Sequence, residues 1–338
     1  MSLHDFIQAM PKAELHVHLQ GATQPETLLK LAQRNNIDLP ADDMDGMREW
    51  YAFQDFSHFI DIYDVICQCI QTPDDLELVM REFIAGQAAQ NIRYTEVTYT
   101  PTVNRMSSTD QLQALDHARK WGEATHGVKV NIVIDIPRGI DDLDILRIAD
   151  IAIEGMDYGV VAFGLGGPEA QYPPELFKKA FDRTLAAGLP SVPHAGEVDG
   201  PKSIWGALNS LHAVRIGHGV RCLEDPALVD ELRNRQIPLE VCPTSNICLG
   251  VFGKIEEHPL PRLIDEGLYV TLNSDDPPMF NTTLTDEYHT VANVFGFDAG
   301  KIEQLVINAL RAAFLPGAEK GQMETEFKQA FAQLKKTE

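Results

Sequence analysis

The sequence predicts an α/β protein built as a (β/α)8 TIM barrel, and three observations point to it. Short apolar runs rich in β-branched residues alternate with amphipathic stretches of helical length. There are eight such runs, and eight parallel strands are the number that closes a barrel. The 338 residues contain no linker-like or low-complexity stretch, so we expect one barrel domain over residues 1–338.

The expected strands occupy eight ranges: 13–19, 92–100, 128–136, 160–165, 189–194, 214–218, 237–242 and 268–273. Helical patterns lie between them, among them 74–90, 108–125, 174–187 and 226–235. Several of these begin with proline or an acidic residue and stop near a glycine, such as Gly127 or Gly188. A doubly wound open sheet is the alternative that the same alternation leaves open.

Two further segments fall outside the simple repeat. Residues 24–71 are too long for one crossover, so we expect extra helices capping the barrel mouth. This segment is rich in aromatic residues that would form a lid or core: Trp50, Tyr51, Phe53, Phe56 and Phe59. After Pro277, the ranges 281–313 and 319–335 are expected to be C-terminal helices on the outside of the barrel.

The charge balance excludes some partners. Lys and Arg number 28 against 50 Asp and Glu, a formal net charge of −22. Nucleic acids and anionic membrane surfaces both select basic patches, so we expect neither as a partner. The five cysteines form no C-x-x-C pair, which favours free, buried thiols over disulfides or a thiolate zinc site. Without a signal peptide pattern or an apolar run of about 18 residues, a cytoplasmic location is expected.

Polar residues that carry chemistry recur where the expected strands end, which is where the active sites of such barrels lie. The first strand ends in His16 and His18, whose side chains point the same way because they are two residues apart. The fifth ends in His194, with Glu197 just beyond it, and the sixth ends in His218. The eighth is followed by Asp275 and Asp276, two adjacent carboxylates that repel each other unless a cation or donor intervenes.

Three imidazoles and a carboxylate suit zinc, which accepts nitrogen and oxygen ligands and leaves a position for water. Some barrels of this kind hold two metals bridged by a carboxylated lysine at the fourth strand. Here that strand ends in Gly164-Leu165-Gly166-Gly167-Pro168-Glu169, without a lysine. One zinc ion per chain is therefore expected.

The motifs PKAELHVHLQG, GLGGPE, PHAGE, RIGHG, CPTSN and NSDDP occur in this order between Pro11 and Pro277, and together they resemble the adenosine deaminase family. The resemblance implies a hydrolytic aminohydrolase in which a metal-activated water replaces the 6-amino group of an adenine nucleoside. It assigns the metal to His16, His18, His194 and Asp275, and counts Asp275 among the catalytic residues too. A small-molecule purine nucleoside is then the expected partner, and the oligomeric state stays open.

The same resemblance assigns the other site residues. Glu197 matches the proton donor to N1, His218 the residue that orients the water, Asp276 the partner of N7, and Gly167 the N–H that meets N3. His18 and Gln20 are expected on the substrate side as well. An uncharged carboxyl on Glu197 at neutral pH requires a pKa raised by desolvation.

One position departs from the adenosine-specific pattern H-x-H-L-D-G, in which the aspartate contacts the 5′-hydroxyl. Gln20 stands there instead, which favours a 5′-modified nucleoside, and SVPHAGE, EVCPTSN and NSDDPPMF resemble the branch that deaminates aminodeoxyfutalosine. Plain adenosine stays open. Deamination of adenine or another aminopurine is the alternative, although that branch looks more like R-x-D-H-G where this chain has Gly217.

Three other interpretations fit less well. The cytidine deaminase architecture uses H-x-E and P-C-x-x-C, and the chain has neither. A metal-dependent amide or ester hydrolase usually uses two metals and the bridging lysine. A non-catalytic binding barrel would tolerate loss of Glu197 or His218, and both are present.

Overall fold

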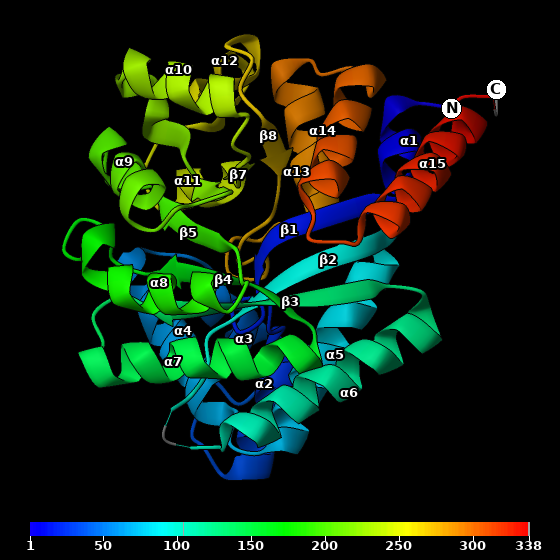
Figure 1. Cartoon of the computed structure of the whole chain (residues 1–338). Coiled ribbons are helices and arrows are strands. Elements are labelled where there is room, and N and C mark those ends of the chain that lie inside the picture. Colours follow the sequence, from blue (N-terminus) through cyan, green and yellow to red (C-terminus); the bar gives the residue numbers. More distant parts are fainter. Residues whose placement is uncertain (104, 337–338) are drawn as a thin grey trace.

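The computed structural model describes residues 1–103 and 105–336, with the side chains of Phe56 and Ser57 left out of the description. Eight parallel strands are hydrogen-bonded in chain order and form the expected barrel. Figure 1 shows strands at the centre of the molecule with helices around them. The ring is completed by a bridge between Val17 and Asp275, so the open doubly wound sheet is ruled out. The strands are β1 (Lys12–His18), β2 (Ile92–Tyr99), β3 (Lys129–Pro137), β4 (Val160–Gly166), β5 (Ser191–Ala195), β6 (Ile216–His218), β7 (Leu239–Val241) and β8 (Val270–Leu272).

The last three strands are shorter than the sequence pattern predicts. Strand β7 begins at Leu239 because Pro238 has no N–H to give to a ladder, although its carbonyl accepts from Ile216. The strand cannot extend far beyond Val241, since Pro243 begins the short helix α11 (Pro243–Cys248). Parallel strands this short place their C-terminal residues directly at the barrel mouth.

Helices surround the barrel between successive strands: α5 (Pro73–Ala89), α6 (Ser108–His126), α7 (Asp142–Glu154), α8 (Lys178–Ala186), α9 (Pro201–Ser210), α10 (Pro226–Arg235) and α12 (Leu260–Asp265). The expected helical pattern at 226–235 is reproduced at both ends, with the Asp225 side chain accepting from Ala227 N–H. The pattern at 174–187 instead divides into a 3₁₀ turn, Pro174–Phe177, and α8.

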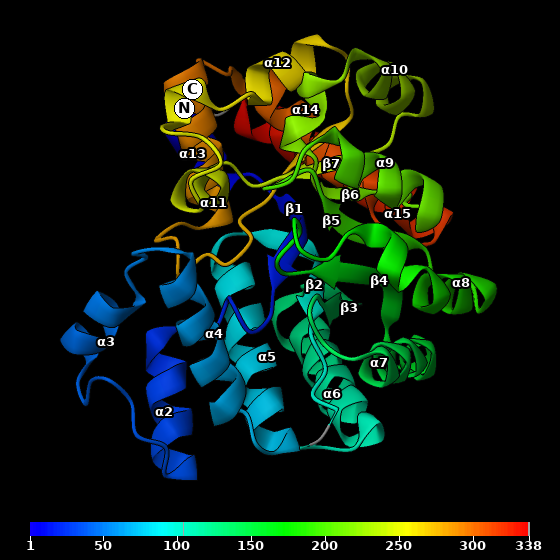
Figure 2. The same cartoon turned by 90° about the vertical axis from the view of Figure 1, so that its left-hand side faces the viewer.

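The segment after β1 forms three helices, α2 (Pro25–Asn35), α3 (Met44–Tyr51) and α4 (Phe56–Cys69), which Figure 2 shows together beside α5. Its aromatic residues divide between core and mouth. Tyr51 is buried and donates its hydroxyl hydrogen to the Thr23 carbonyl. Phe59 stacks on Phe280, with ring centroids 5.7 Å apart. The Phe56 side chain lies outside the described part.

The C-terminal region consists of helices α13 (Leu284–Phe295), α14 (Ala299–Ala312) and α15 (Gly317–Leu334), outside the barrel as expected. The single stretch expected at 281–313 is divided at Gly296, which adopts a left-handed conformation. Helix α14 packs against β1 and β8, and Phe331 of α15 contacts Phe6 of α1 (Leu3–Ala9). Among residues 1–103 and 105–336, no helix is both long and apolar enough to cross a bilayer.

Candidate active site

Four side chains converge at the C-terminal ends of β1 and β5 and just after β8. His16, His18, His194 and Asp275 each offer one ligand atom, and these four atoms all lie within 4.8 Å of one another. The His16 side chain is 3 % exposed and that of His18 12 %. Four donors from distant parts of the sequence thus meet in one water-poor place, as the sequence predicts.

Whether a metal fits this cluster can be judged from its buried polar atoms that have no hydrogen-bond partner. His16 Nε2, His194 Nδ1 and Asp275 Oδ1 are buried and make no hydrogen bond to any described residue. Asp275 Oδ1 lies 3.4 Å from His16 Nε2 and 2.9 Å from His18 Nδ1, without hydrogen-bond geometry. Burying polar atoms without partners is costly, and a cation among the four residues would satisfy His16 Nε2 and Asp275 Oδ1 together. The nitrogen and oxygen donors therefore fit a zinc-type ion.

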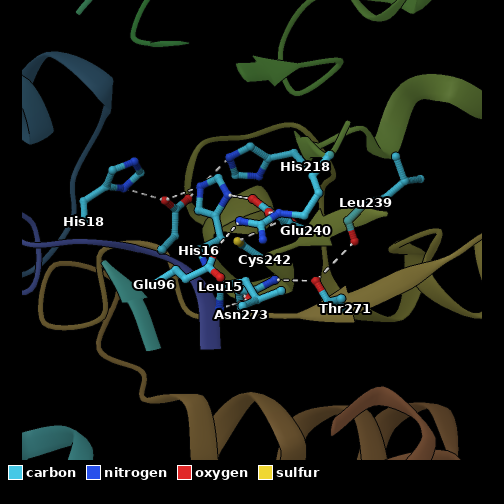
Figure 3. A network of polar contacts seen from close by, with 12 residues as sticks. Leu15, His16, His18, Glu96, His218, Leu239, Glu240, Cys242, Thr271 and Asn273 are labelled. Carbon is cyan, nitrogen blue, oxygen red and sulfur yellow. Dashed lines mark hydrogen bonds and ion pairs between the residues drawn. The ribbon is translucent and has the colours of Figure 1, made fainter. Parts of the chain in front are cut away.

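A second layer of buried polar residues lies behind His16, and Figure 3 shows its contact with Glu240. His16 Nδ1 lies 3.0 Å from Glu240 Oε2, and Arg215 contacts both Glu240 and Glu96. Burial by itself would raise the Glu240 pKa, but Arg215 and His16 hold it below its ordinary value. An ionised Glu240 accepts the Nδ1 hydrogen of His16, which leaves the Nε2 lone pair pointing into the cluster.

The backbone around Asp275 is held in an unusual conformation. Asp275 has φ +67° and His218 has φ +61°, left-handed values that cost a non-glycine residue of order 1 kcal/mol. His18 N–H donates to the Asp275 carbonyl at 2.9 Å, and Asp275 N–H donates to the His16 carbonyl at 3.1 Å. Ser245 Oγ also donates to Asp275 Oδ2 at 2.7 Å. Hydrogen bonds to both the backbone and the side chain of Asp275 thus maintain its left-handed conformation.

Glu197 and His218 lie next to the four donors. His218 Nε2 is 3.6 Å from Glu197 Oε1 and 3.6 Å from Asp275 Oδ2. Burial raises the pKa of Glu197 to about 8, helped by the charges of Asp275 and Glu169. A carboxyl with that pKa carries a proton near neutral pH, as acid catalysis requires.

The loop that carries Glu197 wraps around one carboxylate. Glu169 accepts backbone N–H bonds from four consecutive residues, 196 to 199, at 2.5 to 3.1 Å. Successive N–H groups that converge in this way form an anion-binding nest, here filled by a side chain of the protein itself. Glu169 therefore fixes the position of Glu197.

The cluster opens into a cavity of about 780 Å³. Its polar end includes His18, Gly167 and Asp276. Burial raises the pKa of Asp276 to about 6, and the nearby Asp275 charge adds to that rise. Besides the exposed Asp64, the lining also includes apolar and aromatic residues of several elements: Phe59, Ile60, Tyr63, Ile140, Val198 and Leu249.

Gln20, predicted on the substrate side, contacts a residue of the cavity lining without belonging to that lining itself. It is 2 % exposed and is not among the cavity-lining residues. Its amide donates to the Thr100 carbonyl at 2.7 Å and accepts from Thr100 N–H at 3.4 Å. Thr100 itself lines the cavity, so Gln20 reaches that space through the Thr100 backbone.

The predicted ligands lie together in the structure, and five further residues that contact the site were not predicted from the sequence. Glu169, Glu240, Ser245, Asn246 and His258 all bond to site residues or to one another. The first four lie in or beside motifs quoted above, GLGGPE and EVCPTSN, but no spacing rule assigns them a role. All five cysteines are free, as expected, although Cys67 and Cys248 are only half-buried.

Comparison with known proteins agrees with this geometry. The model of the family described as adenosine deaminase matches residues 11–330. The aminodeoxyfutalosine deaminase of Streptomyces coelicolor is 41 % identical over 96 % of this chain and 85 % of its own length. The crystal structure of adenine deaminase from Arthrobacter aurescens has a TM-score of 0.90 at 33 % identity, covering 95 % of this chain and 99 % of that one. A zinc-bound amidohydrolase from Burkholderia ambifaria has a TM-score of 0.90 at 25 % identity, covering 99 % and 94 %.

Proposed function

Because the chain belongs to the adenosine deaminase family and is a hydrolytic deaminase, we propose that it converts the 6-amino group of an adenine nucleoside to a 6-oxo group with release of ammonia. One observation carries the proposal. Four metal-ligand atoms within 4.8 Å of one another lie beside Glu197 and His218 on a cavity of about 780 Å³.

The proposed cofactor is one zinc ion held by His16, His18, His194 and Asp275. When bound, it would lower the pKa of water towards about 7 and so supply a nucleophile near neutral pH. The other possible ligand set in the described part of the chain is His218, Cys242 and Asp275, which shares Asp275 with the first. The end of β4, Gly164 to Glu169, carries no lysine that could bridge two metals, which favours one ion rather than two. The zinc in the Burkholderia ambifaria amidohydrolase supports the choice of metal.

The protein's own groups act on the purine ring. We assign Glu197 the transfer of a proton to N1, which removes electron density from C6 and prepares it for attack. As water adds to C6, one of its protons passes to the carboxylate that Glu197 has become. The second water proton goes to the amino group as the C6–N bond breaks, so ammonia leaves, oxygen stays on C6 as a carbonyl and N1 keeps its hydrogen. Asp276 would hold N7 and the Gly167 N–H would hold N3, both from the polar end of the cavity.

The cavity supports a substrate larger than a purine. A volume of about 780 Å³ lies in the upper part of the range that encloses drug-sized ligands, about 300–1,000 Å³. Apolar and aromatic residues make up a large part of its lining, and the neutral Gln20 contacts Thr100 of that lining. Together with the Streptomyces coelicolor relative, these features favour an adenine nucleoside extended at the 5′ position, such as aminodeoxyfutalosine.

The second candidate is deamination of free adenine, favoured by the Arthrobacter aurescens structure. The test is kcat/KM for adenine, adenosine and aminodeoxyfutalosine, followed by loss of adenine absorbance and release of ammonia. We expect the 5′-extended nucleoside to be the best substrate and adenosine to be turned over more slowly. A preference for adenine would favour the second candidate, and no ammonia from any of them would contradict deamination of these substrates. The Glu197→Gln variant is the matched control for contaminating activity.

A further inference from the structure

A chain of three hydrogen bonds leads from the backbone of α12 to the ring of His218. Leu260 N–H, the first residue of α12, donates to His258 Nδ1 at 3.2 Å. His258 Nε2 lies 3.1 Å from Asn246 Oδ1, and Asn246 Nδ2 lies 3.2 Å from His218 Nδ1. All three side chains are at most 3 % exposed.

The direction of this chain is fixed at its backbone end, because a peptide N–H can only donate. His258 Nδ1 therefore accepts, and a neutral imidazole with one accepting nitrogen carries its hydrogen on the other. Burial lowers the pKa of His258 to about 3, so the ring is neutral at physiological pH. His258 Nε2 donates to Asn246 Oδ1, which turns the amide nitrogen of Asn246 towards His218.

We propose that His258 and Asn246 are positioning residues that fix the tautomer of His218, with a bare Nδ1 and a hydrogen on Nε2. An amide nitrogen only donates, so His218 Nδ1 has to accept from Asn246. The remaining hydrogen then sits on Nε2, which lies 3.6 Å from both Glu197 Oε1 and Asp275 Oδ2.

The tautomer defines what His218 does in the reaction. Nε2 presents an N–H donor to the centre of the site, so His218 stabilises negative charge that develops on the attacking oxygen. It does not remove a proton through Nε2 in the resting enzyme, because that nitrogen has no free lone pair. The inference rests on the proposed site, but not on the identity of the substrate.

The direct test is the ¹⁵N spectrum of histidine-labelled, metal-loaded protein, with His218 assigned from the spectrum of His218→Gln. Protonated and bare imidazole nitrogens differ widely in ¹⁵N chemical shift. We expect His218 to show a bare Nδ1 and a protonated Nε2. The opposite pattern would overturn the proposal, whatever the substrate proves to be.

The Asn246→Asp variant tests the same series of hydrogen bonds. A carboxylate of the same shape accepts from both histidine rings, so the bond between residue 246 and His218 would reverse its direction. We expect the hydrogen of His218 to appear on Nδ1, and kcat to fall about 10²–10⁴-fold with KM and metal content nearly unchanged. An unchanged ¹⁵N pattern for His218 in this variant would refute the proposed polarity.

His258 supplies a matched pair of variants in case the aspartate variant does not fold. His258→Leu keeps the volume and removes the N–H, whereas the amide nitrogen of His258→Gln can still donate to Asn246. We expect kcat to fall about 10–100-fold in the leucine variant and to recover most of that loss in the glutamine variant. An equal loss of kcat in both variants, or no loss in either, would show that this series of hydrogen bonds has only a structural role.

Discussion

His16 Nδ1 and Glu240 Oε2 lie 3.0 Å apart, with both side chains at most 4 % exposed. His16 lies on β1 and Glu240 on β7, the strands on either side of β8, so the contact links two strands that are not paired with each other. Arg215 Nε lies 2.5 Å from the other oxygen of Glu240. For a metal bound at Nε2, a carboxylate placed in this way would make His16 a stronger ligand.

Glu240→Gln should weaken metal binding about 10- to 100-fold, the usual effect of losing such a partner. The amide cannot accept from His16 and from Arg215 at the same time. Competition with a chromophoric chelator measures the change in Kd for zinc. Glu287→Gln is the matched control, since Glu287 is an equally buried carboxyl that bonds to Thr282 and Thr244 instead. Equal zinc affinity in the two variants would contradict the role given to Glu240.

Glu197→Gln should keep one metal ion per chain and lower kcat about 10²–10⁴-fold, because the amide cannot transfer a proton to the ring. Metal analysis by mass spectrometry and steady-state kinetics provide the two measurements. His194→Ala is expected to lose both the metal and the activity, since a ligand is removed. Loss of metal from the glutamine variant would make Glu197 a ligand rather than an acid.

Glu169→Gln should lower kcat about 10- to 100-fold with full metal content, because it loosens the loop that carries Glu197. The carboxylate accepts N–H bonds from residues 196 to 199, and an amide group has only one accepting oxygen. Hydrogen exchange of these four amides should accelerate in the variant. Unchanged exchange together with full activity would show that the loop holds its shape without Glu169.

Glu287→Gln should stabilise the protein by an amount that grows with pH. Burial raises the pKa of Glu287 from 4.5 to about 7. Below the lower value both states hold the proton, and between the two values only the unfolded chain releases it, so Glu287 destabilises the fold as pH rises. The effect reaches about 3 kcal/mol above pH 7 at about 1.36 kcal/mol per pKa unit.

Urea unfolding of the wild type and of Glu287→Gln, from about pH 4 to about pH 8, measures this effect. The difference in free energy of unfolding should rise through the window and then level off. A difference that stays constant over the whole range would mean that Glu287 titrates alike in both states.

The barrel and the centre of the site could be predicted because both depend on local patterns. Alternating apolar runs indicate strands, and His16 and His18 face the same way by strand geometry. The supporting residues could not be predicted in this manner. Glu240 contacts Arg215 and His16, and His258 contacts Asn246. These residues are distant in the sequence, so their contacts form only when the protein has folded. The side chain of Gln20 likewise turns to the Thr100 backbone, a partner 80 positions away.

Asp275 closes the ring of strands through its backbone, and its carboxylate belongs to the group of four candidate metal ligands. A ligand that binds this side chain therefore also stabilises the seam of the barrel, the Val17–Asp275 bridge that joins the first strand to the residues after the last. Binding energy gained at the site adds to the stability of the barrel by mass action. Removing the metal should accordingly make the seam the first place where the barrel opens, and proteolytic cleavage near Asp275 would report that opening.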